Sequence, residues 1–536
     1  MISLLWSFFR IWLGNKNQHL LLILQNSNEL RGGGGFITQL LDIELGRRSM
    51  RLHFRHDHHE LRGVLRVVPP ADIQKHLKLN HWFFRDSNIF GDFEKSAKRV
   101  IESYGSMYAD AKCTGVIAIN YSLLEQIIKV IGAIQINDIN FNDKNLFYEL
   151  STIVSNVDFH NFEAGSSRKW VLKALFKKVI RNTVLKVWKW PKLIVALRSA
   201  IRTKDVQVYM EDQQLQQKLV HKKLVRPFSS ENCSDAFAIV ENNYLGLKTN
   251  RYLKRVVNRE VHFEFDKQRK TLAGANVKVT LEVQHCGGFD YPISGTYQGV
   301  ITLYFLKTVT KLDVMASDTQ VETGEEGEFV TKSFHYILKV GHKLNVEISY
   351  YIPAKNLASD HYSFKYIKQS GTVHEHMHEV LNFPEHYSVV TQTVHGVSAP
   401  VIMESKCFID GANLQNDYTY EVRATLNHRS PRIFYHEIVA PQTIDIRFNE
   451  VVTFSSDALQ NIQVIAKDSG KVYKPHNYEF RNDGKWLYIH MEDLPETSEK
   501  FYQVVLTNLE NDAGVALPSS REITVVFRPK LFRKTS

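Results

Sequence analysis

The chain has 536 residues, of which 43% are apolar and 23% charged, so it is expected to be globular rather than disordered and to form roughly two to four domains. The formal net charge of +10 fits contact with phosphates, anionic lipid or acidic glycans but does not decide the fold. The four cysteines lie far apart and form no C-x-x-C pair, so neither a zinc site nor a disulfide scaffold is indicated.

The N-terminal stretch MISLLWSFFRIWL is apolar, but it is too short to cross a bilayer as a helix, and Arg10 interrupts it. It also lacks the basic start and the small-residue cleavage site of a secretory signal. We therefore expect an amphipathic helix that packs on the following domain rather than a membrane anchor.

Alternating strand and helix patterns follow. The apolar run 20–24 predicts a strand that is buried on both faces. Helical spacing over 94–105 leads to a second buried strand at 114–120, and a further helix follows over 121–132. Strand, helix and strand in this order predict a βαβ unit in a mixed or parallel sheet, and we assign residues 1–160 to an α/β domain.

Residues 168–204 hold twelve Lys or Arg residues and no acid. A basic stripe recurs at every fourth position, at Lys169, Lys173, Lys177 and Arg181. Pro191 predicts the start of a second helix. Two interpretations stay open for this basic helical insertion, which we place in 161–255 with the return of the chain to the core. The helices either contact an anionic membrane surface or expose a solvated basic face.

From about residue 255 onward, apolar and polar residues alternate, as over 277–283, which predicts strands. Strands at this spacing, separated by Gly-rich breaks, predict a β-rich domain over 256–437. A last segment, 438–536, has its own set of alternating strands between polar turns and predicts a C-terminal β-sandwich.

The stretch QNSNELRGGGGF (25–36) places a carboxylate, a cation and four glycines directly after the first apolar run. Glycines allow backbone N–H groups to converge on an anion, and Arg31 can hold a phosphate through two hydrogen bonds. No Lys-Ser/Thr pair follows and no G-x-G-x-x-G spacing occurs, so nucleotide motifs are excluded. The alternative for this loop is a plain tight turn.

A second polar cluster lies in WFFRDSNIFGDF (82–93), which contains Arg85, Asp86, Asn88 and Asp92. These side chains stand between an aromatic segment and the start of a helix. Asp92 or Asn88 can therefore serve simply as the N-cap of that helix.

Three stretches, LLLILQNSNELRGGGGFI, WFFRDSN…DFEKSA and TGVIAINYSLLEQIIKVIGAIQI, resemble in order and spacing the bacterial family called domain of unknown function 4012. The stretches KDVQVYMEDQQLQ, ENNYLGLKTNRYLKR and HYSFKYIKQSG are similar to later landmarks of that family. Gly32 and Gly33 depart from its usual residues, as does Thr114. Family members usually carry a transmembrane helix and a long helical segment before the first motif, whereas this chain begins almost at the motif.

The order of elements is also loosely similar, at the level of fold, to the LytR–CpsA–Psr envelope phosphotransferases. Those enzymes move a glycan phosphate from a polyprenyl pyrophosphate carrier to the cell wall, using arginines and a magnesium-binding Asp. Their G-S-D-x-R motif is absent, and QNSNELR stands in its place. The segment 438–529, with FNEVVTF and LENDAGVAL, resembles the Ig-like domains of bacterial surface-layer proteins.

These resemblances imply a set of site residues. The expected catalytic residues are Glu29, Arg31, Arg85 and Asp86, with Glu29 as general base and the arginines on the phosphate. The expected anion-binding residues are Asn26, Asn28, Gly34, Gly35 and Asn88. Magnesium would be held by Asp42, Asp86 or Asp92.

The expected protein is a membrane-associated cell-envelope protein on the extracytoplasmic face that handles an anionic or pyrophosphate-linked glycopolymer, with no nucleic-acid partner. Its expected activity is phosphotransfer of the LytR–CpsA–Psr type; the alternative is a non-catalytic surface, assembly or adhesion protein. Arg31 and Arg85 gathered around one polar cleft would favour the enzyme. Both arginines held in ion pairs, with no cleft beside them, would favour the alternative.

Overall fold

The computed structural model of the protein describes most of residues 18–526. The segments left out of the description are 1–17, 47–48, 56–66, 109–110, 156–163, 267–270, 288–292, 318, 358–360, 385–386, 396–400, 404, 412–413, 427–432, 441, 456–457, 493, 495–500, 512–513, 515, 517–522 and 527–536. The helix expected in the N-terminal stretch lies outside the described residues.

A five-stranded mixed sheet forms the core of the N-terminal domain, in the spatial order β3-β2-β1-β4-β7. The central strand β1 (Gln18–Asn26) pairs antiparallel with β2 (Phe36–Gly46) and parallel with β4 (Lys112–Asn120). The edge strands are β3 (Ser49–Arg55) and β7 (Val206–Met210). The α/β class expected for this part of the chain is confirmed.

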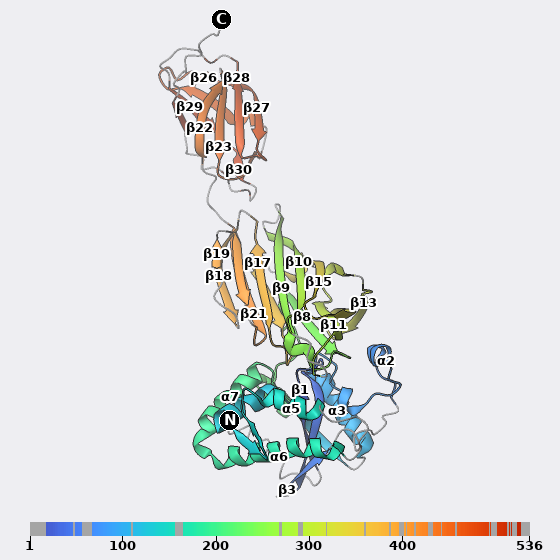
Figure 1. The fold of residues 1–536 in the computed structure, drawn as a ribbon. Coiled ribbons are helices and arrows are strands. Elements are labelled where there is room, and N and C mark those ends of the chain that lie inside the picture. Colours follow the sequence, from blue (N-terminus) through green and yellow to red (C-terminus); the bar gives the residue numbers. More distant parts are fainter. Residues whose placement is uncertain are drawn as a thin grey trace.

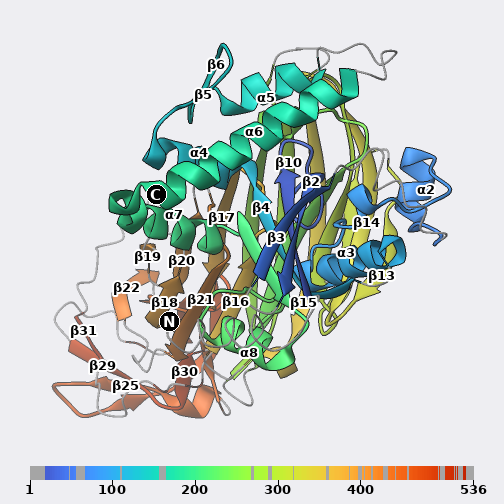
Figure 2. The same ribbon diagram turned by 90° about the horizontal axis from the view of Figure 1, so that it is seen from below.

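Helices cover both faces of this sheet (Figure 2). On one face, α3 (Phe93–Met107) packs Ala97 and Val100 against Leu21 and Ile23 of β1. On the other face, α4 (Tyr121–Ile131) and α7 (Trp190–Arg202) pack against β4 and β7. The other elements of the domain are α2 (Ala71–Leu77), η1 (Phe84–Asp86), β5 (Ile134–Ile136), β6 (Ile139–Phe141), α5 (Leu146–Ser155), α6 (Ala164–Leu185), η2 (Val187–Lys189) and α8 (Gln213–His221).

The middle domain is a sandwich of two seven-stranded sheets around one apolar core. The first sheet contains, in spatial order, β12 (Thr310–Ala316), β15 (Lys343–Pro353), β10 (Thr271–His285), β9 (Leu253–Asp266), β17 (Glu375–Asn382), β20 (Lys406–Gly411) and β19 (Val401–Met403). The second contains β13 (Glu322–Glu326), β14 (Phe329–Leu338), β11 (Tyr297–Leu306), β8 (Asp235–Asn243), β16 (His361–Ile367), β21 (Tyr418–Leu426) and β18 (Tyr387–His395). The short helices η3 (Thr249–Tyr252) and η4 (Ala354–Asn356) join its strands.

The sandwich begins earlier in the chain than the alternation of residues indicates. Every residue of β8 is buried, so this strand has no alternating pattern, and the sequence assigns it to the return toward the α/β core. In the structure β8 lies between β11 and β16, and the expected boundary at 255–256 falls inside β9.

The C-terminal strands form a separate unit with its own core. One four-stranded sheet contains β22 (Ile433–Ala440), β23 (Thr443–Phe448), β28 (Trp486–Met491) and β27 (Pro475–Arg481). The other contains β26 (Val472–Tyr473), β25 (Ile462–Ala466), β29 (Phe501–Leu506) and β31 (Ile523–Val526). A smaller pair, β24 (Val452–Phe454) and β30 (Leu509–Asn511), and the helix η5 (Ala458–Asn461) complete it. Figure 1 shows this unit and the helices α6 and α7 at opposite ends of an elongated molecule. No helix in the described part of the chain combines the length and apolarity needed to cross a membrane.

Candidate functional site

The glycine-rich loop lies between the α/β sheet and the sandwich, and other parts of the protein already occupy its backbone donors. The N–H of Gly33 donates to the carbonyl oxygen of Asn88 at 2.7 Å, and that of Gly32 to the side-chain oxygen of Asn242 at 2.9 Å. The N–H of Gly34 donates to the carbonyl oxygen of Arg31 at 2.8 Å. These three donors therefore do not converge on a space where an anion could bind.

Close packing explains why these positions are glycine. A Cβ on Gly32 would stand 2.1 Å from the carbonyl oxygen of Ile89, and one on Gly35 would stand 2.5 Å from the backbone of Asn26. Gly34 has a φ of +124°, in the region that disfavours residues with a Cβ. The missing side chains thus let two backbone segments meet inside the protein.

Arg31 is buried in the same place and is held on several sides. Its guanidinium donates to the carbonyl oxygen of Asn243 and lies 3.4 Å from a carboxylate oxygen of Asp86. The rings of Phe36 and Tyr244 lie 5.3 and 5.6 Å from it. A buried charge with a counterion, a hydrogen bond and aromatic neighbours stabilises a contact between two domains.

Arg85 reaches the same carboxylate from the solvent side. Its Nε lies 3.6 Å from Asp86, and about a third of its side chain is exposed. Arg31 and Arg85 therefore share one carboxylate. Asp86 itself is only 2% exposed, so the three side chains form a buried ion cluster rather than the wall of an open cleft.

The remaining polar residues of the predicted site brace the turn. Glu29 accepts a hydrogen bond from the side chain of Asn26 at 3.2 Å and lies 3.7 Å from the ammonium of Lys248. The N–H of Asn28 donates to the side-chain oxygen of Asn26 at 3.1 Å. The side chain of Asn88 donates to the carbonyl oxygen of Gly35.

The structure does not bring the three predicted magnesium ligands together. Asp42 is buried against α3, where it contacts His19 at 2.7 Å and Tyr104 at 2.6 Å. Asp92 caps α3 by accepting from the N–H of Glu94, and Asp86 belongs to the arginine cluster. Within the described residues, no group of three or more His, Cys, Asp or Glu side chains is placed to hold a metal ion.

The sandwich supplies partners that inspection of the loop alone does not reveal. The side chain of Gln369 donates to the carbonyl oxygens of Arg31, at 3.0 Å, and Glu241, at 2.7 Å. The side-chain oxygen of Asn250 accepts from the N–H of Leu30 at 3.0 Å. Both residues lie in the landmark stretches HYSFKYIKQSG and ENNYLGLKTNRYLKR, which therefore contribute to the same contact as the glycines. We call this contact the interdomain joint: loop 27–35 with segments 85–89, 241–250 and 368–371.

A second candidate site lies on the basic helices. Nine large apolar side chains there are 37–68% exposed: Ile180, Val184, Leu185, Val187, Trp188, Trp190, Ile194, Val195 and Leu197. Exposed cations stand among them at Lys177, Lys178, Arg181, Lys192 and Arg198. We call this surface of α6, η2 and α7 the helical face.

The opposite sides of these helices are attached to the domain, so the exposed side chains are not a consequence of loose helices. Leu175 and Val179 of α6 are buried in a core with α4, β5 and α5. Ala200 of α7 is buried against Leu123 and Val206. The basic stripe expected on α6 is described for Lys173, Lys177 and Arg181, while the side chain of Lys169 lies outside the described residues.

Comparisons with known proteins support the family resemblance for part of the chain. Residues 15–152 match the family model described as protein of unknown function (DUF4012). This match spans four strands of the α/β sheet and ends before β7. A search of curated proteins finds no significant match.

Solved structures give only remote similarity. A proposed nutrient-binding protein of Legionella pneumophila matches with 7% identity and a TM-score of 0.24, over 35% of this chain and 71% of that one. An M1 zinc metallopeptidase of Deinococcus radiodurans matches with 9% identity and a TM-score of 0.20, over 38% of this chain and 48% of that one. Scores this low carry no argument about activity.

Proposed function

We propose that this protein is a membrane-associated cell-envelope protein that binds an anionic membrane surface through its helical face and supports the assembly or display of an anionic glycopolymer. The observation that carries the proposal is the group of nine exposed apolar side chains on a helical pair without acids. On this proposal the interdomain joint is structural.

Exposing apolar side chains of this size to water costs free energy. Monomeric soluble proteins rarely expose contiguous apolar patches larger than a few hundred Å². Tryptophan is favoured at the boundary between lipid headgroups and acyl chains, and Lys or Arg gains roughly 1 kcal/mol per residue near an anionic leaflet. Trp188 is 68% exposed, and the same pair of helices carries exposed cations, which is the combination that an amphipathic membrane-surface helix presents.

The shape of the molecule is compatible with membrane contact through the helical face. The helical face and the C-terminal strands lie at opposite ends of the protein (Figure 1). Membrane contact through α6 and α7 would leave the C-terminal unit farthest from the lipid. We propose that this unit is an Ig-like domain displayed on the extracytoplasmic side, supported by its two four-stranded sheets around one core.

Vesicle flotation tests the membrane contact. The full chain is expected to float with vesicles that contain acidic phospholipid and to remain below with neutral ones. A Trp188→Ala/Val195→Ala variant removes two of the most exposed apolar side chains and should lose most of the recovery. A matched variant, Met315→Ala/Phe434→Ala, removes two equally exposed side chains elsewhere and should float like the wild type. Equal recovery on neutral vesicles, no recovery, or equal effects of both variants would exclude the proposal.

One observation keeps phosphotransfer of the LytR–CpsA–Psr type as a second candidate: Arg31 and Arg85 share Asp86. Arg85 is about a third exposed and would meet a pyrophosphate at the surface, whereas Asp86 is buried and would reach a magnesium ion only if the cluster opened. The test is retention of a polyprenyl pyrophosphate analogue with and without Mg²⁺. Wild-type binding that falls in Arg31→Ala and Arg85→Ala would support this candidate. Absence of wild-type binding under both conditions would remove it.

A further inference from the structure

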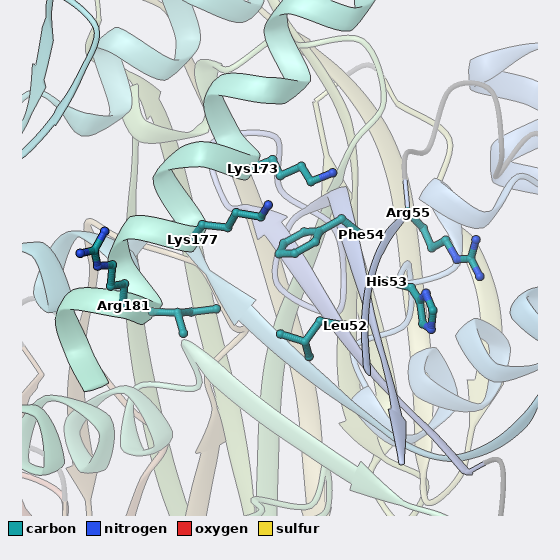
Figure 3. Close-up of a pocket in the computed structure, with 8 residues that line it drawn as sticks. Leu52, His53, Phe54, Arg55, Lys173, Lys177 and Arg181 are labelled. Carbon is teal, nitrogen blue, oxygen red and sulfur yellow. The ribbon is translucent and has the colours of Figure 1, made fainter. Parts of the chain in front are cut away.

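A cavity of about 540 Å³ opens between the edge strand β3 and helix α6 (Figure 3). Its lining consists of Leu52, His53, Phe54 and Arg55 from the strand and Lys173, Lys177, Ile180 and Arg181 from the helix. Among the residues that the structure describes, no acidic side chain lines it. The cavity is separate from the interdomain joint, and it adjoins the helical face because Ile180 belongs to both.

Successive side chains of β3 point to opposite sides of the strand, so only every second one faces the cavity. The side chains that face it, Leu52 and Phe54, form what we call the apolar floor. Leu52 and Phe54 point toward α6, whereas His53 and Arg55 point to the other side of β3 (Figure 3). On that other side, His53 contacts Glu44 at 2.8 Å and Arg55 lies over the ring of Tyr108 at 4.6 Å. The side chains that face the space are therefore apolar ones from the strand and cations from the helix.

Two of the cations project toward the apolar floor. Lys173 and Lys177 lie one helical turn apart and extend their ammonium groups toward β3 (Figure 3). The ammonium of Lys173 lies 5.6 Å from the centre of the Phe54 ring. The centres of the Phe54 and Phe176 rings lie 6.4 Å apart in an edge-to-face arrangement. Among the described residues, no carboxylate forms an ion pair with Lys173, Lys177 or Arg181.

We propose that this cavity binds the phosphate monoester headgroup of a single membrane amphiphile. The proposal rests on the membrane contact described above and gives that contact a specific ligand class. The phosphate would lie between Lys173 and Lys177, and the first part of the apolar chain would lie along Leu52 and Phe54. The chain would then leave past Ile180 toward the exposed apolar side chains of the helical face.

Charge and geometry favour a monoester over other anions. A phosphate monoester carries about −1.5 to −2 charges at pH 7 and three acceptor oxygens, which two ammonium groups can share. A carboxylate offers one charge, and a phosphodiester offers one charge with two bulky substituents. The apolar floor can bury the attached apolar chain, which a free phosphate ion lacks. We therefore expect the chain to contribute to the affinity.

Titration calorimetry on the full chain tests the site without a membrane. The probe is dihexanoyl phosphatidic acid below its micelle concentration, compared with dihexanoyl phosphatidylcholine and inorganic phosphate. We expect binding of the phosphatidic acid, at least about tenfold weaker binding by Lys173→Gln/Lys177→Gln, and no change in Lys192→Gln/Arg198→Gln, which removes two charges of the helical face outside the cavity. Circular dichroism should show that both variants remain folded.

The failures of this proposal and of the membrane proposal are distinguishable. No binding of phosphatidic acid, equal binding of phosphatidylcholine, or equal binding by both charge variants would overturn the cavity assignment, even if the protein still floats with acidic vesicles. Inorganic phosphate that competes as well as phosphatidic acid would overturn the amphiphile assignment, because the apolar floor would then contribute nothing. Binding of soluble phosphatidic acid without flotation would support the cavity and count against membrane docking.

Discussion

The interdomain joint and the helical face distribute polar and apolar groups in opposite ways. The joint buries Arg31, Asp86 and several asparagines, and it gives most of them partners inside the protein. The helical face exposes nine large apolar side chains and places cations among them. A buried and paired polar group indicates a structural contact, whereas apolar side chains left in water indicate a surface that another component covers.

The difference also explains why a glycine-rich loop beside an arginine is a weak indicator of anion binding. Both a phosphate site and a tight backbone contact need residues without Cβ, and both use N–H donors. The two cases differ only in what those donors meet. In this protein the donors of Gly32 and Gly33 meet Asn242 and Asn88, which lie far away in sequence.

The largest effect is expected from removing a cation buried beside the joint. Arg255 pairs with Glu241 and lies 3.7 Å from Glu375, and all three are buried. Arg255→Leu should lower the free energy of unfolding by about 3–5 kcal/mol, because two buried carboxylates lose their counterion. Lys343→Leu, which removes an exposed partner of Glu282, should cost only about 0–1 kcal/mol. Equal costs in urea denaturation would contradict the inference that this buried ion cluster stabilises the sandwich.

A smaller loss is expected from adding one methyl group to the joint. In Gly32→Ala the new Cβ would meet a backbone carbonyl at 2.1 Å, and overpacking of this kind costs about 1–3 kcal/mol. The matched control is Gly105→Ala in α3, where nothing lies within 4 Å, and a gain of about 0.5–1 kcal/mol is expected from helix propensity. Thermal unfolding of both variants measures the contrast. A neutral Gly32→Ala would indicate a loop with spare room.

Removing cations from the helical face tests whether charge contributes to its binding of acidic membranes. Lys192→Gln/Arg198→Gln should weaken partitioning onto acidic vesicles by about 1 kcal/mol per residue at low salt. The loss should shrink as ionic strength rises, because a Debye length of about 8 Å at 0.15 M screens exposed charges. Vesicle sedimentation at two salt concentrations provides the measurement. A loss that is independent of salt would mean that the cations act through packing rather than through charge.

The smallest effect concerns a second contact between the domains, where α2 rests on the sandwich. The imidazole of His76 stacks on that of His335 at 4.2 Å, with Asp72, Lys75 and Glu322 around the pair. Burial first, and neighbouring cationic groups second, lower the pKa of both imidazoles. The separated state therefore binds more protons as pH falls below the ordinary value of about 6.5, so the contact is complete above that pH and weakens below it.

Melting curves at pH 7.5 and 5.5 measure this contact. We expect the wild type to lose about 1–2 °C more than His76→Gln on acidification, since ordered domains of this size shift by a few degrees per kcal/mol. The control is His378→Gln. His378 is exposed on the sandwich, where it lies 3.1 Å from Asp410, away from the contact of α2 with His335. An equal pH dependence in wild type and His76→Gln would contradict the coupling of α2 to histidine charge.

The sequence predicts the local elements of this protein better than their partners. Periodic apolar residues correctly indicate α3 and α4, because each of these helices has its own buried face, and the apolar stretch 114–120 correctly indicates β4. The strand β8 is buried along its whole length, and its place in the sandwich follows from its pairing with β11 and β16 rather than from a local pattern. Asp42 and Asp92 look like equivalent ligand candidates in sequence, yet one faces α3 and the other caps it. Proximity of residues far apart in the chain depends on packing, which local patterns do not contain.

The loop between β16 and β17, residues 368–374, has a consequence for folding during synthesis. Ser370 donates to the carbonyl oxygen of Lys204, which lies 166 positions earlier in the chain. Gln369 donates to the carbonyl oxygen of Arg31, which lies 338 positions earlier. At about 5–20 residues per second, a ribosome needs roughly 10 to 30 s to make the intervening segment. During that interval the nascent α/β domain has its sheet but lacks the side chains of Gln369 and Ser370 that later hydrogen-bond to it. The surface of the α/β domain that later contacts the sandwich would remain accessible to a chaperone until the sandwich emerges.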